Sequence, residues 1–177
     1  MSTQKPVRQE FGTVEENALR IDEDKAEQLI DALNTDLAAT EVLYHQLRKH
    51  HWTVHGAEYR DLHLFYQEAY ETASEGADHL AERVQALGGV PVSRPADFQE
   101  RSPVEPEPED IYEVRTMMKN DEVMYGDIIE RVREHIELAE NLGDYATSEL
   151  LREQLEELEE FAHEIEHFLA EDSLTKW

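Results

Sequence analysis

The chain has 177 residues, with 16 Lys and Arg against 42 Asp and Glu and a formal net charge of −26 at pH 7. Hydrophobic residues make up 40% of it, enough for one compact core, and cysteine is absent, which excludes disulfides, thiolate metal sites and thiol catalysis. No apolar run is long enough for a membrane span, and no apolar signal core opens the chain. We therefore expect a cytoplasmic protein without membrane contact, in which any metal is held by His, Asp and Glu.

In chain order, the sequence predicts a tail, four long helices and a second tail. Residues 1–20 are polar without helical periodicity and predict a flexible tail; residues 21–171 predict one domain, and residues 172–177 a C-terminal tail. Apolar residues recur at helical spacing over about 22–54, 58–87, 114–143 and 144–171.

The connections between these helices indicate the fold. Gly56, Gly88 and Gly143 follow the first three periodic stretches, as expected where helices end. Five of the six prolines lie between Val90 and Pro108, which predicts a long connection with one short helical turn near residues 96–100. The three connections between the four long helices are short, long and short, and no segment has a strand signal. This pattern predicts an all-α, ferritin-like four-helix bundle with a crossover between the second and third helices.

Polar residues of the second helix are placed by their helical angle. At about 100° per residue, with Leu62 at zero, the apolar stripe lies within about 60° of zero. His63 falls at about 100°, Asp78 at about 160° and Glu82 at about 200°, so these side chains face away from the bundle core. A metal site built on this helix must be completed by another surface, most simply a symmetry mate.

Other histidines offer weaker signals. The last helix contains Glu160-x-x-His163 and Glu164-x-x-His167, but the same arithmetic places these residues off its apolar stripe, which argues against a di-iron centre inside one subunit. We interpret His45, His50 and His79 as surface or packed side chains rather than ligands.

Several separated motifs carry a family resemblance. They are Lys49-x-His51-Trp52-x-Val54-x-Gly56, Leu62-His63, Asp78-x-x-Ala81-Glu82-Arg83, Leu87-Gly88-Gly89, and Leu142-Gly143-Asp144 with Thr147 and Leu150-Leu151. Together they resemble the Dps family, the DNA-binding proteins from starved cells, which are miniferritins. The acidic composition resembles that of halophilic archaeal members.

The resemblance implies a shell of twelve subunits that oxidises Fe(II) to Fe(III), preferably with hydrogen peroxide rather than oxygen, and stores ferric oxide inside. It implies that His51 and His63 of one subunit bind iron together with Asp78 and Glu82 of its two-fold neighbour. It also places Trp52 beside the metal. His and carboxylate ligands suit both oxidation states of iron.

One position departs from the family pattern. Four residues after the second histidine the family usually has an acid, whereas this chain has Gln67, a neutral and weaker ligand. His55, one helical turn after His51, and Glu71, one turn after Gln67, are the available substitutes. A structural or DNA-compacting shell with a weakened ferroxidase centre is therefore the alternative function.

Acidic residues of the last predicted helix have two interpretations. If the resemblance holds, Asp144, Glu149 and Glu153 are candidate pore residues that concentrate Fe(II), and Glu156 and Glu160 are candidate mineral nucleation residues. The simpler interpretation is a hydrated exterior face.

The charge of the chain bears on its partners. A strongly negative surface repels DNA and attracts cations, and before Arg20 the first segment has only Lys5 and Arg8 as basic residues. We therefore expect protection through iron chemistry without direct DNA binding. Acids spread over every exposed face also suit a protein kept hydrated in high salt.

Overall fold

The computed structural model describes residues 6–170 and, within this range, contains five α-helices and no strand. The helices are α1 (Glu23–Thr53), α2 (Tyr59–Ala86), α3 (Pro95–Arg101), α4 (Val114–Leu142) and α5 (Tyr145–Leu169). Each predicted helix is present close to its expected bounds, the short crossover helix included. The expected C-terminal tail, residues 172–177, lies outside the described residues.

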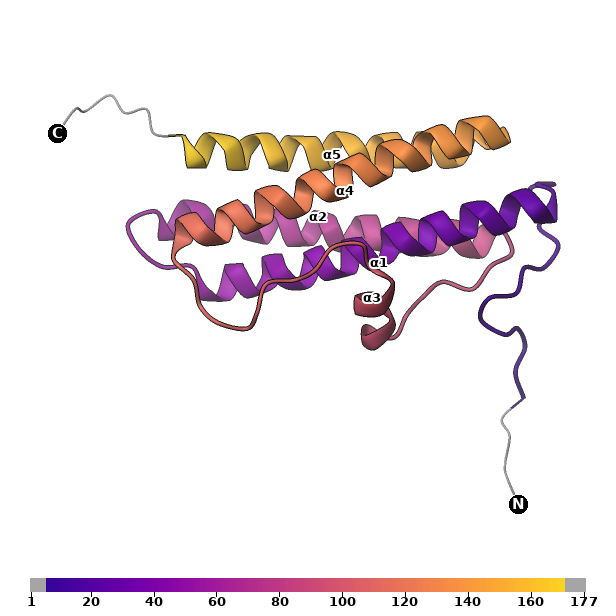
Figure 1. Cartoon of the computed structure of the whole chain (residues 1–177), viewed down its shortest axis with the longest axis horizontal. Helices are drawn as coiled ribbons and strands as arrows, with labels where there is room; N and C mark the ends of the chain where they lie inside the picture. Colours follow the sequence, from indigo (N-terminus) through magenta and orange to yellow (C-terminus); the bar gives the residue numbers. More distant parts are fainter. Residues whose placement is uncertain (1–5, 171–177) are drawn as a thin grey trace, which may run out of the picture.

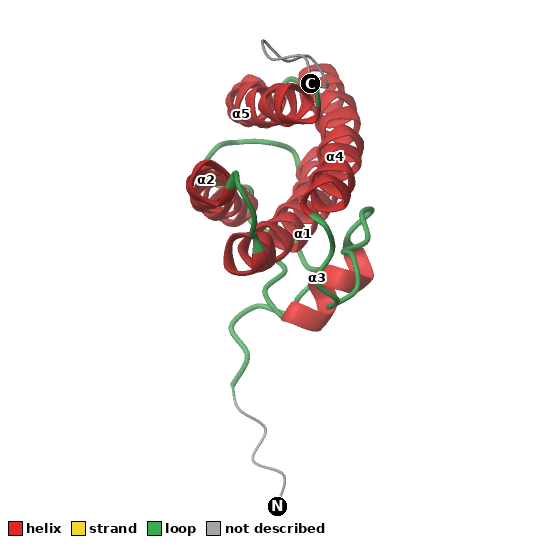
Figure 2. Ribbon diagram, turned by 90° about the vertical axis from the view of Figure 1, so that its left-hand side faces the viewer, coloured by secondary structure: helices red, strands yellow, loops and turns green. Residues whose placement is uncertain are grey.

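The four long helices form a bundle, and α3 lies outside it. Figure 1 shows α1 and α2 as one long pair and α4 and α5 as another, with the crossover running along the outer side of α1 before it joins α4. Seen end-on in Figure 2, α1, α2, α4 and α5 surround a common centre, while α3 lies on the outer side of α1. The arrangement is the four-helix bundle with a long crossover between α2 and α4 that the sequence predicts.

The bundle is held together by the apolar stripes that the sequence predicts. Leu62, Leu80 and Val84 of α2 are at most 1% exposed and belong to one continuous core. Met117 and Ile128 of α4 and Leu151 of α5 enter the same core. No helix within residues 6–170 is both long and apolar enough to cross a bilayer.

Part of the N-terminal segment is attached to the end of α2. The Glu15 backbone N–H and the Gln9 side-chain amide both donate to the Gly88 carbonyl oxygen, at 2.9 Å and 2.8 Å. Gly88 has a φ of 91°, and a Cβ at this position would collide with the Glu15 carbonyl. Together with Val14, which packs on the core, these contacts differ from the expectation of a flexible tail over residues 1–20. The polar composition of this segment gave no sign of these contacts, because they join residues far apart in the sequence.

Asp144 caps the N-terminus of α5. Its carboxylate accepts hydrogen bonds from the Thr147 backbone N–H, at 3.0 Å, and from the Arg83 guanidinium, at 2.7 Å and 2.8 Å. Burial of the side chain opposes ionisation, but the bonds from Arg83 and Thr147 outweigh it and lower the pKa of Asp144. This corrects the interpretation of Asp144 as a pore residue, because its carboxylate is 3% exposed and already bound within the chain.

We expect Asp144→Ala to lower the free energy of unfolding by about 3 kcal/mol at neutral pH, because it removes the cap and leaves Arg83 without its partner. The pKa of Asp144 is lowered from its ordinary value of 3.8, so the carboxylate stabilises the fold above that value. This contribution is lost as pH falls through the lowered pKa. Denaturant unfolding at fixed protein concentration and several pH values measures the difference between the two proteins.

The matched control is Asp127→Ala, which removes an exposed carboxylate of α4. It should change the unfolding free energy by less than about 0.5 kcal/mol. A loss at Asp144 that stayed the same at acid pH would contradict the ionic part of this account.

Candidate metal centre

Two histidine rings meet where α1 ends and α2 begins. The rings of His51 and His63 are stacked, with centroids 3.8 Å apart and planes inclined by 19°. His51 Nδ1 lies 2.9 Å from the His63 carbonyl oxygen, and His63 Nδ1 lies 2.9 Å from the His51 carbonyl oxygen. A carbonyl oxygen can only accept, so each ring donates its Nδ1 proton and leaves the Nε2 lone pair available to a metal ion.

Aromatic side chains surround the histidine pair. Tyr59 stacks on His63 with ring centroids 5.1 Å apart, and Tyr70 meets His51 edge-on at 5.3 Å. Trp52 is 65% exposed, and the Arg48 guanidinium lies 4.9 Å from its ring centroid. The histidines are therefore held in place while remaining half-buried, within reach of solvent.

Directly behind the pair, His50 is fully buried in a charged network. Its Nδ1 lies 2.8 Å from an Asp121 carboxylate oxygen of α4, and its Nε2 lies 2.6 Å from a Glu107 carboxylate oxygen of the crossover. Burial opposes the charged ring, but the bonds to Asp121 and Glu107 raise the pKa of His50 above its ordinary value. Lys49 Nζ also lies 2.7 Å from a Glu107 carboxylate oxygen. Lys49 and His50 therefore face the carboxylates of Glu107 and Asp121.

Sequence reasoning placed His50 among surface or packed side chains and missed Glu107 and Asp121. Each of these acids lies far from His50 in the sequence, and an acid is common in this chain, so no local signal marked them. The pattern that does mark His50 in retrospect is its place on the core-facing side of α1, next to Leu47.

Gln67 and Glu71 continue the surface beyond His63. They lie one and two turns further along α2, and the Gln67 amide nitrogen donates to a Glu71 carboxylate oxygen at 3.0 Å. Because the Gln67 amide nitrogen is occupied by this bond, its side-chain carbonyl oxygen is the atom available to a cation. Both residues therefore remain candidate ligands, Gln67 as a neutral one and Glu71 as an anionic one.

His55 has a different position from the one predicted. As a substitute ligand, His55 would have to lie one helical turn after His51, which requires α1 to continue past it. However, α1 ends at Thr53, Val54 has an extended backbone with ψ of 138°, and Gly56 has a φ of 111°. His55 therefore lies in the connecting loop, exposed, with Nδ1 3.2 Å from the Thr53 carbonyl oxygen, and the spacing argument for it fails.

Asp78 and Glu82 lie far from the histidine pair within one chain. They are exposed and one turn apart, but Asp78 follows His63 by 15 residues of continuous α2. At 1.5 Å per residue this separates them by about 22 Å. Within residues 6–170, accordingly, no group of three His, Cys, Asp or Glu side chains is arranged to hold a metal ion.

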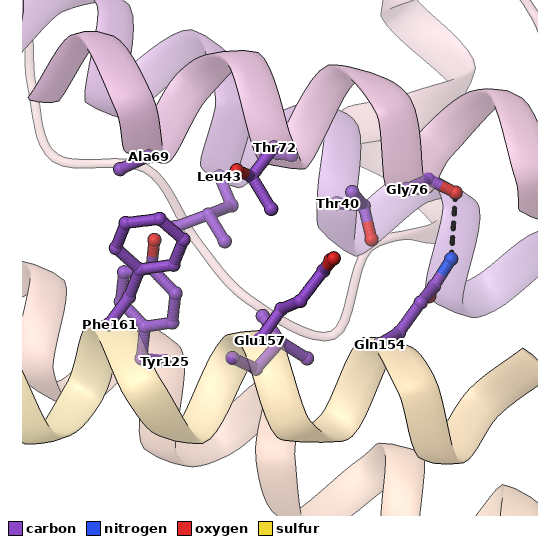
Figure 3. Close-up of a pocket in the computed structure, with 11 residues that line it drawn as sticks. Thr40, Leu43, Ala69, Thr72, Gly76, Tyr125, Gln154, Glu157 and Phe161 are labelled. Carbon is purple, nitrogen blue, oxygen red and sulfur yellow. Dashed lines mark hydrogen bonds between the residues drawn. The ribbon is translucent and has the colours of Figure 1, made fainter.

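A small cavity inside the described part of the bundle does not offer a set of iron ligands either. Figure 3 shows a small cavity between α1, α2 and α5, where Thr40, Thr72 and Glu157 point inward and the Gln154 amide donates to the Gly76 carbonyl oxygen at 2.8 Å. Glu157 is the one carboxylate that lines it, and burial is the main cause that raises its pKa. A di-iron centre inside a bundle needs several Glu and His side chains, so this cavity does not fit one.

The acidic residues of α5 form a solvent-facing surface. Glu149 and Glu153 line a shallow groove between α5 and α2 that also includes Glu82 and His79. Glu156 and Glu160 are exposed further along the helix. Their roles as pore or nucleation residues remain predictions, because these roles are defined by neighbouring subunits.

Similarity to known proteins agrees with this geometry. Residues 30–175 match the ferritin-like domain family. The DNA protection during starvation protein of Halobacterium salinarum is 62% identical to this chain, over 98% of this chain and 96% of its own length. The chain belongs to the Dps family of ferritin-like proteins. A nutrient stress-induced DNA-binding protein of Synechococcus is 39% identical over 94% of both chains.

Solved structures of this family match the bundle closely. The crystal structure of an archaeal Dps homologue from Halobacterium salinarum has a TM-score of 0.94 and 61% identity, covering 99% of this chain and 98% of that one. A Dps protein of Vibrio cholerae, described as a member of a broad superfamily of ferritin-like diiron-carboxylate proteins, has a TM-score of 0.82 and 27% identity. It covers 87% of this chain and 96% of its own. The family predicted from the sequence is thereby confirmed.

Proposed function

We propose that this chain is a ferroxidase that oxidises Fe(II), preferably with hydrogen peroxide, and stores the Fe(III) as oxide inside a hollow shell of identical subunits. In this way it protects the cell and its DNA from oxidative damage. The observation that supports the proposal most directly is the stacked His51 and His63 pair, whose Nδ1 protons are bound to backbone carbonyls and whose Nε2 atoms are left for metal. Membership of a family that includes a diiron-carboxylate protein supports iron as the metal.

The complete centre is proposed to lie between two subunits. His51 and His63 come from one chain, Asp78 and Glu82 come from its two-fold neighbour, and Gln67 and Glu71 are the nearest additional ligands. The separation along α2 supports this arrangement, because one chain cannot bring its own two halves together. A dodecameric shell is the assembly that the family resemblance implies.

The proposed reaction consumes two Fe(II) for each hydrogen peroxide. Each Fe(II) gives one electron, the O–O bond breaks, and two protons complete two water molecules, so 2 Fe(II) + H₂O₂ + 2 H⁺ gives 2 Fe(III) + 2 H₂O. Taking both electrons at one centre avoids the one-electron step that releases hydroxyl radical. Trp52, exposed beside His51, is placed to intercept a radical that does form. The net charge of −26 raises the local concentration of Fe(II).

The first prediction for the proposed function concerns the oxidation of iron by hydrogen peroxide. When anaerobic Fe(II) and hydrogen peroxide are added to the assembled protein in high-salt buffer, we expect about two Fe(II) to be consumed per peroxide, with little hydroxyl radical. Fe(III) should then co-elute with the shell on size-exclusion chromatography. The stoichiometry, a spin-trap assay and ferric iron in each fraction measure these outcomes. Oxygen in place of peroxide should give slower oxidation.

Two variants separate a working centre from an inactive one. His63→Ala should lower the initial oxidation rate at least about tenfold with the shell intact, because it removes a ligand. Gln67→Glu adds an anionic ligand and should change the rate if the centre works. If iron precipitates freely beside an intact wild-type shell and Gln67→Glu changes nothing, the alternative of a structural acidic shell is the better account.

The second prediction concerns the shared site. Chains with His51→Ala and His63→Ala, or with Asp78→Ala and Glu82→Ala, should both be inactive when assembled alone. In mixed shells, about half of randomly formed pairs combine one chain of each kind, and each such pair has one intact and one empty site. About a quarter of the wild-type rate should therefore return, measured as peroxide-dependent Fe(II) oxidation. A centre built within one chain would give no recovery.

The third prediction concerns DNA. The name of the Synechococcus relative describes DNA binding, but we propose that this chain does not bind DNA directly, since each neutralised phosphate requires a cation and the chain has only 16 Lys and Arg against 42 acids. A gel-shift titration from low to high salt should show no retention at any concentration. Tight retention at low salt with a steep loss on adding salt would contradict it.

A further inference from the structure

A second pair of histidines lies near the end of α5. The sequence there is His163-Glu164-Ile165-Glu166-His167, so the two histidines are four residues apart and share one face of the helix. Two histidines at this spacing on a helix, with a glutamate after the first, form a recurring arrangement of zinc-binding proteins. The Glu-x-x-His spacings of this segment share the same histidines but do not reveal this four-residue spacing.

The two rings lie close enough to share one ion, which would replace the proton between their facing nitrogens. The Nε2 atoms of His163 and His167 lie 3.1 Å apart, and the ring planes are inclined by 69°. Two nitrogens each about 2.0–2.1 Å from a tetrahedral ion are about 3.3 Å apart, and for an octahedral ion about 2.9 Å. The observed separation falls between these values, so a small adjustment of either side chain admits the ion.

A neighbouring carboxylate supports the required form of the ring. Glu166 lies 3.4 Å from His163 Nδ1, on the side opposite the nitrogen that faces His167. A carboxylate beside Nδ1 favours the tautomer with its proton there and leaves the lone pair on Nε2, as in metal sites whose histidines are oriented by acids. His163 remains 65% exposed, so an ion can reach the pair from solvent.

We propose that His163 and His167 bind one divalent transition-metal ion of the zinc class, with Zn²⁺ as the representative and water in the remaining positions. Imidazole nitrogen selects Zn²⁺, Co²⁺ or Ni²⁺ over Mg²⁺ and Ca²⁺, which prefer oxygen. We propose binding without hydrolysis, because both histidines lie on the exposed face of α5. The site is separate from the proposed iron centre, since α5 contributes nothing to the His51 and His63 pair.

The test measures Zn²⁺ binding to the assembled protein carrying His51→Ala and His63→Ala, which removes the other histidine pair. Isothermal titration is carried out in high salt with excess Mg²⁺, so that sites made of carboxylates alone are occupied by Mg²⁺. We expect about one Zn²⁺ per chain. Adding His163→Gln or His167→Gln should abolish this binding or weaken it at least about tenfold. Co²⁺ in place of Zn²⁺ should give a visible absorption band that the same variants lose.

The matched control is His45→Gln, which removes an exposed histidine of α1 that has no second histidine one turn away. It should leave Zn²⁺ binding unchanged. Equal Zn²⁺ binding with and without His163 and His167, or none in the parent variant with its assembly intact, would overturn the proposal. His163→Gln in the otherwise wild-type chain should oxidise Fe(II) at the normal rate, so failure here is distinguishable from failure of the proposed function.

Discussion

The rise of a single α-helix decides how this chain can build an iron centre. His63 and Asp78 lie 15 residues apart on α2, which runs without a break from Tyr59 to Ala86, and about 22 Å therefore separates them. No rotamer change closes that distance. In the proposed arrangement one chain carries two halves of a site, the His51 and His63 pair where α1 and α2 meet and Asp78 with Glu82 further along α2. A two-fold neighbour running in the opposite direction is the simplest way to join them. The proposed activity is consequently a property of the assembly, and whatever disturbs the pairing of subunits disturbs the chemistry as well.

The histidine half of the site depends on the buried charges behind it. His50 is adjacent to His51 and is bound on both ring nitrogens, to Asp121 of α4 and to Glu107 of the crossover. Gln46 and Tyr66 complete the partners of Asp121, and Asn120 and Lys49 those of Glu107, so every member of the network is paired. Charges that are buried and fully paired fix one arrangement, whereas removal of one partner is costly. The network therefore attaches the last turn of α1, which carries His51, to α4 and to the long crossover.

Much of this structure could be predicted from the sequence because it depends on periodicity. The stripe from Leu62 to Val84 is buried as the 3.6-residue repeat requires, and the same arithmetic correctly turned His63, Asp78 and Glu82 away from the core. Three features that the sequence did not reveal have one physical cause, which is that contacts between distant segments leave no periodic signal. Asp144 is bound by Arg83 of α2, residues 9–15 are attached to Gly88, and His50 is bound by acids 57 and 71 residues away. His55 was misplaced by a smaller error, the assumption that α1 continues past Thr53.

Carboxylates and imidazoles have different tasks in so acidic a chain. With 42 acids in the chain, the field attracts every cation, so it raises the local concentration of cations without selecting one metal. Selection among metal ions therefore depends on the nine histidines. The histidines best suited to it are those whose lone pairs are oriented before the ion binds. Among the described residues, histidine rings contact one another in two pairs, His51 with His63 and His163 with His167. We propose that a neighbour completes the ligand set of the first pair, whose Nδ1 atoms face backbone carbonyls, whereas the Nε2 atoms of the second pair face each other. The same residue type is thus proposed to serve a shared redox centre in one place and a simple binding site in the other, because the partners of the ring nitrogens differ.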